Sequence, residues 1–448
     1  MIPEEFLSRM KNILGDEYAD FESALSEENV RAVRVNTTKI SVEDFLSKTE
    51  LSVKEIPYAS DGFIPENADG IGKSAEHHSG MFYVQDPGAM ATVKALDICS
   101  GWRVMDACAA PGGKASQLAS AVGEDGVLLA NEFVPKRAKI IVGNFERLGI
   151  KNAVVTSMDT ARLAEMFSCY FDLVLCDAPC SGEGMFRKYD EAVSEWSVEN
   201  VELCAERQTE ILENCQKCVK AGGYLLYSTC TYSLEENEGV VTSFLESHPE
   251  FSLCDVKDEI KQITADGLLG LDKARRFYPH KFSGEGQFIA LLKKDENSAN
   301  LPTILYKDSA KPASKADLAV ANAFLKENLN SIPNGRIISI GEQLAIVSHD
   351  LPLPPHSVFM GGVLLGEVKK GILFPHHQFF SAFGKDFKRR VNLSRGDARV
   401  QKYLRGEEID ADVDAGWCAV LYEGVSLGGG KVSGGRLKNH YPKGLRNK

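Results

Sequence analysis

The sequence has no long run of apolar residues. None approaches the about 18–20 consecutive apolar residues that a membrane-spanning helix needs. The N-terminal segment, MIPEEFLSRMKNILGDEYADF, is charged, and it lacks the basic start, apolar stretch and small-residue cleavage site of a signal peptide. We therefore expect a cytoplasmic protein that has no membrane partner.

Cysteine motifs of the kind that bind zinc are also scarce. The chain has 11 cysteines, an odd number at irregular spacings, which argues against a disulfide framework and for reduced thiols. Cys215 and Cys218 form one CxxC, but they lie in a helical pattern, and no second CxxC or neighbouring histidine completes a zinc site. We expect these two thiols to pack in the core and the protein to hold no metal.

Positive charge is in short supply. The formal net charge is −12, which by itself argues mildly against a nucleic-acid partner, because phosphate binding requires a basic surface. The basic residues are unevenly distributed along the chain, however. Residues 385–405 hold eight Lys or Arg against two acids, and residues 431–448 hold six and no acid. These clusters are either solvated faces or a binding surface for an anionic partner.

The chain of 448 residues is longer than one hydrophobic core usually serves, so we expect two or three domains. Residues 1–75 predict a small N-terminal domain with an RNA-binding or auxiliary role. Residues 76–294 alternate short apolar runs with helical patterns, which is typical of α/β folds with a mostly parallel sheet and helices on both faces. The expected strands are 102–107, 126–132, 152–157, 171–178 and 222–230, with a further strand, 286–294, at an edge of the sheet.

The pattern of polar and apolar residues changes after this expected domain. Residues 295–315 are polar and contain proline, which is typical of a linker. Residues 316–380 begin with a helical pattern and continue with short β-like runs, and we predict that they form the first part of a C-terminal domain. Residues 381–448 contain both basic clusters and end in a glycine-rich stretch, which predicts a basic β-rich module that binds RNA.

The dinucleotide-binding pattern GxGxxG is absent. The first expected strand instead leads into DACAAPGGKASQLAS, residues 106–120, where Gly112 and Gly113 allow a tight turn before a helix. Such a turn brings backbone amides close to a ligand at the positive end of the helix. Glu132, at the end of the next strand, suits a hydrogen bond to ribose hydroxyls. The pattern favours a nucleoside without phosphates, such as S-adenosylmethionine, and argues against a dehydrogenase.

Acidic residues follow four successive expected strands, at Asp106, Glu132, Asp159 and Asp177. Ligands of open α/β sheets bind outside the carboxyl ends of the strands, so we expect these four side chains in one crevice. The alternative for each of them alone is a turn or a helix cap. Four caps in succession explain the pattern less well than one shared site.

Two cysteines lie just beyond the fourth and fifth expected strands. Cys180 follows DAP, and Cys230 ends LLYSTC. If those strands are neighbours, both thiols face the crevice, whereas the alternative for either one is packing in the core. A thiolate that adds to carbon 6 of cytosine makes carbon 5 nucleophilic towards a sulfonium methyl group, and a carboxyl group near ring nitrogen 3, such as Asp177, assists. The cytosine must be single-stranded or flipped out of its helix. The spacing alone does not decide which cysteine attacks.

These motifs carry a resemblance to a known family. The sequence resembles the RNA (cytosine-5)-methyltransferases of the Sun family, and most closely the bacterial group that acts on 16S ribosomal RNA. The tail, which includes LKNHYPKGLR, looks like the C-terminal RNA-binding extension of that group. The matching motifs are RVN (34–36), GMFYVQDPGAM (80–90), DACAAPGGK (106–114), DAPCSGEGMFRK (177–188), YSTCTYSLEENEGVV (227–241) and RFYPHKFSGEGQFIALL (276–292).

The resemblance implies a Rossmann-like methyltransferase domain that uses S-adenosylmethionine, and it divides the work between the cysteines. Cys230 would be the nucleophile, and Cys180 would assist the breakdown of the covalent adduct. Asp177 would face both the cofactor and the base, while Glu132 would hold the ribose and Asp159 the adenine. The implied cofactor-binding residues are Cys108, Ala109, Ala110, Pro111, Gly112, Gly113, Lys114, Glu132, Asp159 and Asp177, although Lys114 has the alternative of a solvated lysine at a helix start.

The resemblance also makes 16S rRNA, or the small ribosomal subunit, the expected partner of a monomeric enzyme. Two alternatives stay open, namely a cytosine-5 methyltransferase of tRNA and a non-catalytic, RNA-binding factor for ribosome assembly. The intact DAPC and STC motifs argue against the second alternative, because a binding module has no use for both thiols.

Overall fold

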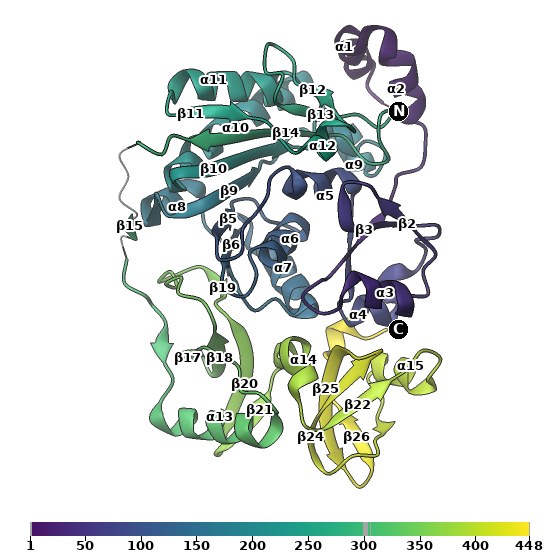
Figure 1. The fold of residues 1–448 in the computed structure, drawn as a ribbon, viewed down its shortest axis with the longest axis vertical. Coiled ribbons are helices and arrows are strands. Elements are labelled where there is room, and N and C mark those ends of the chain that lie inside the picture. Colours follow the sequence, from purple (N-terminus) through teal and green to yellow (C-terminus); the bar gives the residue numbers. More distant parts are fainter. Residues whose placement is uncertain (1, 299–302, 305, 448) are drawn as a thin grey trace.

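The computed structural model describes residues 2–298, 303–304 and 306–447. Figure 1 shows a large α/β domain, with an N-terminal unit (purple) beside it and two smaller C-terminal units (green and yellow) below it. The predicted α/β class with N- and C-terminal additions is therefore confirmed. None of the helices in the described residues is long and apolar enough to cross a membrane.

The N-terminal unit combines a helical hairpin with a small antiparallel sheet. The hairpin buries Phe6, Met10 and Phe21, and the sheet has the order β2-β3-β1-β4. Because β4 comes after residue 75, this sheet extends past the expected limit of the first domain, and the domain limits stay predictions. The elements are α1 (Glu4–Leu14), α2 (Tyr18–Ala24), β1 (Ala32–Val35), α3 (Val42–Lys48), β2 (Val53–Ile56), β3 (Ala59–Pro65), α4 (Ala75–His78) and β4 (Phe82–Gln85).

The central sheet has the order β12-β13-β14-β10-β9-β5-β6-β7-β19, and β11 also pairs with β14. The five strands predicted before residue 231 are present, and neighbours among them are parallel, so their carboxyl ends meet at one end of the sheet. They are β5 (Arg103–Asp106), β6 (Val127–Asn131), β7 (Ala153–Thr156), β9 (Phe171–Asp177) and β10 (Val219–Thr229). The helices of this domain are α5 (Pro87–Lys94), α6 (Gly113–Ala121), α7 (Pro135–Leu148), α8 (Thr160–Met166), α9 (Asp190–Glu195), α10 (Val198–Cys218), α11 (Val240–Ser247) and α12 (Asp258–Lys261).

The predicted position of the strand at 286–294 is wrong. This strand, β14 (Gln287–Lys294), is not at an edge, because it pairs with β10 on one side and with both β13 and β11 on the other. Its side chains are almost all buried, as an interior strand requires. The strands beyond it are β11 (Phe251–Cys254), β12 (Ala265–Asp266) and β13 (Arg275–Phe277), and the opposite edge is β19 (Val358–Met360), which pairs with β7.

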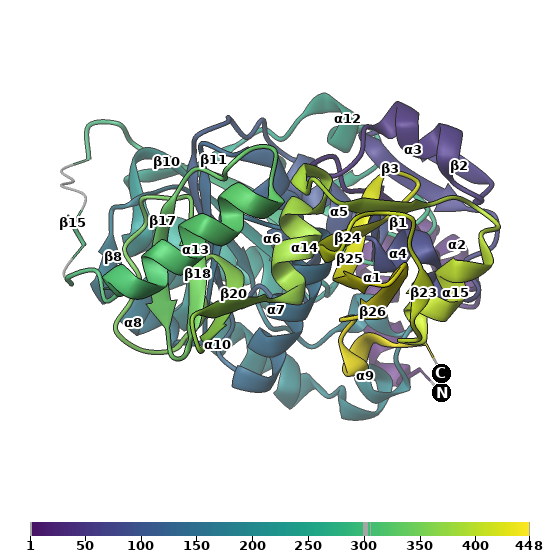
Figure 2. The same cartoon turned by 90° about the horizontal axis from the view of Figure 1, so that it is seen from below.

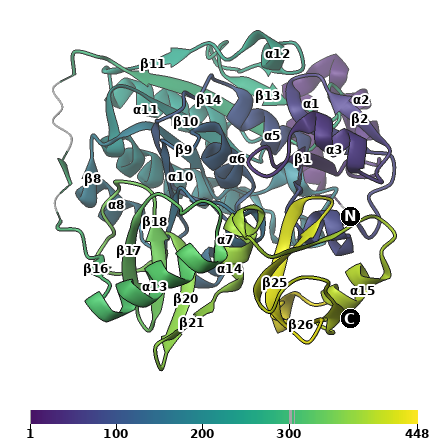
Figure 3. The same cartoon turned by 60° about the horizontal axis from the view of Figure 1, so that its bottom comes forward.

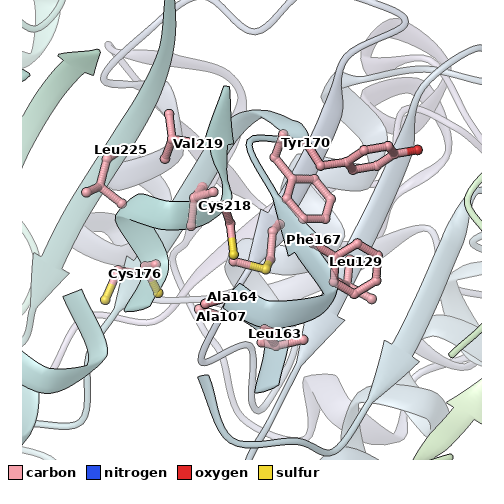
Figure 4. Packing of buried hydrophobic residues seen from close by; sticks show 14 of the residues in the cluster. Ala107, Leu129, Leu163, Ala164, Phe167, Tyr170, Cys176, Cys218, Val219 and Leu225 are labelled. Atoms are coloured by element: carbon pink, nitrogen blue, oxygen red, sulfur yellow. The ribbon is translucent and has the colours of Figure 1, made fainter. Parts of the chain in front are cut away.

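The core below β9 and β10 fixes the strands whose ends carry the predicted site. Figure 4 shows Cys176 of β9 and Leu225 of β10 among the buried side chains of this cluster, together with Phe167, Cys218 and Val219. Cys215 is buried in the same cluster, so both thiols of the CxxC pack among apolar side chains.

Two five-stranded sheets follow the central domain. The first has the order β16-β17-β18-β20-β21 and the second the order β22-β24-β25-β26-β23. The first unit contains β16 (Lys311–Pro312), α13 (Lys315–Asn328), β17 (Arg336–Ile340), β18 (Gln343–Val347), β20 (Val363–Lys369) and β21 (Ile372–Pro375). The second contains α14 (His377–Phe383), β22 (Arg390–Leu393), α15 (Ala398–Leu404), β23 (Ile409–Asp410), β24 (Gly416–Tyr422), β25 (Val425–Ser433) and β26 (Arg436–Asn439).

Part of the predicted linker, 295–315, lies outside the described residues, namely 299–302 and 305. The parts that are described pair with other segments. β15 (Thr303–Ile304) pairs with β8 (Phe167–Ser168) of the central domain, and β16 joins the next sheet. These described parts of the segment are therefore anchored at several points.

One buried ammonium group joins three parts of the molecule. The Nζ atom of Lys39, in the N-terminal unit, donates hydrogen bonds to the carbonyl oxygens of Ser79 at 2.8 Å, Arg147 at 3.0 Å and Ser426 at 3.3 Å. Burial lowers the pKa of Lys39 well below its usual range. Figures 2 and 3 show α14 next to α7 in the same region, and α14 contacts both α7 and β25. The last unit is therefore held directly against the central domain.

Candidate active site

The two predicted cysteines lie side by side. β9 and β10 are adjacent parallel strands, in which Asp177 is opposite Ser228. Because the two strands end at the same level, the loops that follow them begin together, and the Sγ atoms of Cys180 and Cys230 are 3.2 Å apart. Both are free thiols and both are partly buried. The structure thus places the predicted pair, 50 residues apart in the sequence, in direct contact.

The surroundings of Cys180 favour its protonated form. The neighbouring Cys230 sulfur, followed by burial, raises the pKa of the Cys180 thiol well above its usual range. A hydrogen bond from the backbone N–H of Cys230 to Cys180 Sγ, at 3.3 Å, opposes this shift only in part. Cys180 therefore keeps its proton at neutral pH. A neutral thiol is a poor nucleophile but can donate a hydrogen bond to the sulfur beside it.

Asp177 links the thiols to the glycine loop. Its Oδ2 atom accepts a hydrogen bond from Lys114 Nζ at 2.9 Å, and its Oδ1 atom accepts one from Ser228 Oγ at 2.5 Å. The Lys114 side chain is only 12% exposed, so the alternative of a solvated lysine is wrong. Burial lowers the pKa of Lys114, but Asp177 outweighs this effect, and the net shift is upward. The lysine therefore stays charged beside the carboxylate.

The glycine loop is held against the ends of β5 and β6. Gly112 has φ +108°, a value that favours glycine, and it immediately precedes α6. The backbone N–H of Cys108 contacts Asp106 Oδ1 at 3.3 Å, and that of Ala109 donates to the carbonyl oxygen of Asn131 at 2.8 Å. The predicted loop residues thus form one anchored turn that ends at the first amides of α6.

The predicted acids at the ends of β6 and β7 differ in burial. Glu132 is buried, accepts a hydrogen bond from the backbone N–H of Val134 at 2.9 Å and forms an ion pair with Arg137 at 3.3 Å. Asp159 is exposed, and its carboxylate caps α8 by accepting a hydrogen bond from the backbone N–H of Arg162 at 2.8 Å. The helix cap considered as the alternative for Asp159 is therefore present in the structure.

Asp106 is the most unusual carboxyl group of the crevice. It is 1% exposed, and its Oδ2 atom has no hydrogen-bond partner among the described residues. Burial, followed by the charge of Asp177, raises the pKa of Asp106 to about 8. Sequence reasoning placed Asp106 in the crevice but did not assign it to ligand binding. The signal available for it was its position at the end of the first strand.

A buried glutamate that sequence reasoning missed anchors the Cys180 loop. Glu236, which lies in a short helical segment (Glu235–Gly239) after Cys230, accepts hydrogen bonds from the backbone N–H of Ser181 at 2.9 Å and from Gln208 Nε2 at 2.7 Å. The hydroxyl group of Ser181 donates to the same carboxylate. The residue directly after Cys180 is therefore fixed by a side chain that follows the other cysteine.

A second buried glutamate, which follows Cys180, anchors the segment after Cys230. Glu183, in the loop after Cys180, accepts hydrogen bonds from Thr231 Oγ1 and from the backbone N–H of Tyr232, both at 2.9 Å. Its other oxygen accepts one from Trp196 Nε1, also at 2.9 Å. Each cysteine loop is thus held by a carboxyl group from the other loop, and we call Glu183 and Glu236 the carboxylate brace. Both residues lie inside motifs noted in the sequence, but their linear spacing does not reveal that they bond across the two loops.

The N-terminal helices support these loops from outside. Phe6 of α1 is 4.9 Å from Phe186, and Phe21 of α2 is 5.2 Å from Tyr232, between ring centroids. Phe186 and Tyr232 belong to the segments that follow the two cysteines. The buried face of the hairpin therefore packs directly on the segments that follow the two cysteines, and this explains why residues near the chain start belong to the same structural unit as the site.

Comparison with known proteins identifies the family. The model described as 16S rRNA methyltransferase RsmB/F matches residues 93–293, and models for the N-terminal domain and the PUA domain of RsmF match residues 2–87 and 390–447. The ribosomal RNA small subunit methyltransferase F of Aeromonas salmonicida is 31% identical, over 99% of this chain and 97% of its own. That of Escherichia coli O157:H7 is 32% identical, over 99% and 96%. The chain belongs to the 16S rRNA methyltransferase RsmB/F family.

Solved structures agree with this assignment. A methyltransferase homolog protein from Pyrococcus horikoshii is 30% identical, with a TM-score of 0.58, over 65% of this chain and 95% of its own. NSun6 from Pyrococcus horikoshii with SFG has the same TM-score at 24% identity, over 65% and 98%, and it shows the fold alone. The RsmB/F protein described here is accordingly an S-adenosylmethionine-dependent methyltransferase.

The residues of the crevice fit this methyl donor. S-adenosylmethionine carries N–H donors and ribose hydroxyls, and the ends of β5 and β6 offer the buried, unpartnered oxygen of Asp106 and the buried carboxyl group of Glu132. The first amides of α6 complement a carboxylate at the methionine end. The residues of this RsmB/F protein therefore offer hydrogen-bond partners for both ends of the ligand.

The carboxylate brace predicts a measurable effect on the thiols. We expect Glu183→Gln and Glu236→Gln each to slow the oxidation of Cys180 and Cys230 to a disulfide by diamide by ~10- to ~100-fold, because small misplacements of reacting atoms cost rates of this order. An amide replaces one acceptor oxygen by an N–H donor that faces other donors. Thiol titration and peptide mass spectrometry follow the reaction.

Glu76→Gln is the matched control for this measurement. Glu76 is also buried, and it also accepts hydrogen bonds from a hydroxyl and a backbone N–H, those of Thr49 at 3.0 Å and Glu50 at 2.9 Å, but it lies in the N-terminal unit. We expect its oxidation rate to equal that of the wild type. Wild-type rates in both brace variants would contradict the role assigned to Glu183 and Glu236.

Asp106 predicts a pH dependence of stability. Its pKa is raised from 3.8 to about 8 in the folded state, so the folded state binds the proton more tightly, and stability is lost as the pH rises from about 4 towards about 8. Between pH 5 and pH 8, we expect the free energy of unfolding of Asp106→Asn to fall by about 2–4 kcal/mol less than that of the wild type. Urea unfolding measures this difference. Calorimetry should show weaker binding of S-adenosylmethionine. Identical pH dependence in the two proteins would contradict this account.

Proposed function

We propose that this enzyme methylates carbon 5 of a cytosine in 16S rRNA, with Cys230 as the nucleophile. The observation that carries the proposal is the contact between Cys180 and Cys230, at 3.2 Å, directly beside Asp177 at the shared end of β9 and β10. The printed names of the relatives support 16S rRNA as the substrate. The contact supports a covalent mechanism, since two thiols next to a carboxylate serve no purpose in direct methyl transfer.

The cofactor would be held by the predicted loop and strand-end acids. The bound cofactor supplies an electrophilic methyl group on a positively charged sulfur. Glu132 suits the ribose hydroxyls, because its carboxyl group is buried at the end of β6. The loop Cys108–Lys114 brings the amides of α6 to the methionine end. Asp159 remains our assignment for the adenine, at the exposed end of β7, and Asp106 joins the set through its unpartnered oxygen.

The two cysteines divide the chemistry. The Cys230 thiolate adds to carbon 6 of the cytosine, while the Asp177 carboxyl group faces ring nitrogen 3, and carbon 5 then takes the methyl group. Transfer of the carbon-5 proton to water then expels the Cys230 sulfur as a thiolate. Cys180 keeps its own proton because the adjacent sulfur and burial raise its pKa, so it offers a hydrogen bond to the departing sulfur. We therefore keep Cys230 as the nucleophile and Cys180 as the residue that assists release, as the family resemblance implies.

The remaining parts of the proposal concern the state of the enzyme and its partner. We propose a monomer, since one chain supplies both thiols, the acids and the glycine loop. The steps above require a thiolate, a carboxyl group and a methyl donor, so the proposal includes no metal. Bisulfite sequencing of free rRNA and of small ribosomal subunits decides which of the two is the substrate. A cytoplasmic location stays our prediction.

The roles of the cysteines predict opposite phenotypes. We expect Cys230→Ala to abolish methyl transfer while binding S-adenosylmethionine as the wild type does, because the cofactor site is left intact. Cys180→Ala should instead accumulate a covalent protein–RNA complex, because release is slowed. Denaturing gels with labelled RNA, together with calorimetry for the cofactor, measure both effects. Full activity of Cys230→Ala, or a covalent complex in that variant, would overturn the assignment.

Bisulfite sequencing tests the substrate. We expect purified enzyme and S-adenosylmethionine to create a bisulfite-resistant cytosine in unmethylated 16S rRNA or in small subunits that contain it. Comparison of free rRNA with subunits identifies the better substrate, and the Cys230→Ala protein serves as the matched control. Resistance that arises only in tRNA would replace rRNA by tRNA, and no resistant cytosine in either would favour the assembly factor.

A further inference from the structure

Three neighbouring strands of the last sheet carry a row of unusual side chains. Trp417 of β24 is opposite Lys431 of β25, and Lys431 is opposite Lys438 of β26. Directly opposed residues share one face of a sheet, so the row projects from a single face. Lys431 Nζ lies 5.6 Å from the centroid of the Trp417 ring. His440, two residues after Lys438, lies 4.9 Å from the same ring.

The two lysines of this row have no carboxylate partner. Like charges placed directly opposite each other on adjacent strands destabilise a sheet. Within the described part of the chain, neither Lys431 nor Lys438 forms an ion pair, although the same hairpin pairs Arg436 with Glu408 at 3.5 Å and with Asp410 at 2.9 Å. In a chain with a net charge of −12, acids were available for these lysines too. The opposed cations therefore point to a negatively charged partner.

An exposed aromatic side chain from the other C-terminal sheet completes this surface. Phe374, on the edge strand β21, is 43% exposed, and its ring lies 6.3 Å from that of Trp417. Ile372, on the same side of β21, is 55% exposed. Figure 1 shows β21 and β24 next to each other where the green and yellow units meet. The surface therefore combines cations from one unit with exposed apolar side chains from the other.

His440 lies against the ring of Trp417 and is held neutral. Burial, followed by the charges of Lys438 and Lys431, lowers the pKa of His440. The ring therefore offers a flat face and a hydrogen-bonding nitrogen, while the positive charge of the surface comes from the two lysines. Trp417 itself is only 7% exposed and packs in the core that the two C-terminal units share, while Lys431, Lys438, His440 and Phe374 are exposed. Cations next to exposed rings match an anionic polymer with planar bases, since the lysines suit phosphates and the rings suit bases.

We propose that Phe374, Lys431, Lys438 and His440, which surround the buried ring of Trp417, bind a single-stranded segment of the RNA substrate across the junction of the two C-terminal units. Lys431 and Lys438 contact its phosphates, and Phe374 stacks on one of its bases. A paired segment would bury its bases and leave Phe374 and Ile372 without a partner. The inference rests on the proposed RNA substrate and adds the place and the form in which that RNA is held.

Binding of an unstructured, fluorescein-labelled single-stranded RNA to the full-length protein tests the proposal. In fluorescence anisotropy without cofactor, we expect Lys431→Met with Lys438→Met to weaken binding and to reduce the slope of log K against log salt by about 1.4, since each phosphate contact of a single strand contributes about 0.7. Phe374→Ala should weaken binding by about 5- to 100-fold with an unchanged slope, because stacking does not release counterions.

One single variant separates binding from folding. Lys438→Met alone removes repulsion from the sheet. We therefore expect its thermal midpoint to stay the same or rise while its RNA affinity falls, a combination that unfolding cannot produce.

The outcomes also separate this proposal from the proposed function. Methyl transfer is measured on the same proteins, and we expect a raised KM for RNA with an unchanged kcat at saturation. If the protein binds RNA through these lysines but methylates no RNA, the proposed function is wrong and the proposed binding surface is retained. A wild-type salt slope in the double lysine variant would contradict RNA binding at this surface. So would a variant that loses binding to small subunits but binds RNA normally, because the surface would then bind a protein partner.

Discussion

The contact between two thiols, held by the carboxylate brace, is the constraint on which the rest of the site depends. A loop placed after a strand is ordinarily free to move by an ångström or more, and such movement would separate the sulfurs of Cys180 and Cys230. Glu183 and Glu236 prevent it, because each fixes the loop that follows the other cysteine. Since the bonds are reciprocal, neither loop can shift without breaking bonds in both. The 3.2 Å contact is thus a property of the pair of loops.

The sheet provides the second condition for this contact. Only adjacent parallel strands deliver two following loops to the same point, and β9 and β10 are adjacent because β10 is itself held between β9 and β14. The interior position of β14 therefore matters for chemistry as well as for packing, since a strand paired on both sides moves less than an edge strand. Asp177 and Ser228, opposite each other at the ends of these strands, extend the same register to Lys114 of the glycine loop.

Sequence patterns predicted the parts of the site that depend on local order. Apolar runs identified the five parallel strands, and their ends identified the acids and both cysteines, because a parallel sheet gathers its carboxyl ends. Patterns could not show the carboxylate brace, whose partners are set by tertiary contact between two loops. They also misplaced β14, since its interior position depends on pairing with short strands such as β13 that carry weak signals. Likewise, the burial of Lys114 follows from Asp177, which lies 63 residues away.

The distribution of charge reconciles an acidic chain with an RNA substrate. Several arginines that the structure describes in the last unit have carboxylate partners, as Arg436 has with Asp410, and contribute little to a long-range field. The opposed lysines of β25 and β26 are different, because their repulsion is relieved only when a negative group approaches. A net negative surface elsewhere repels RNA, so binding is confined to the places where cations are left unpaired. The negative surface, which repels RNA, therefore determines where the RNA binds as much as the unpaired cations that attract it.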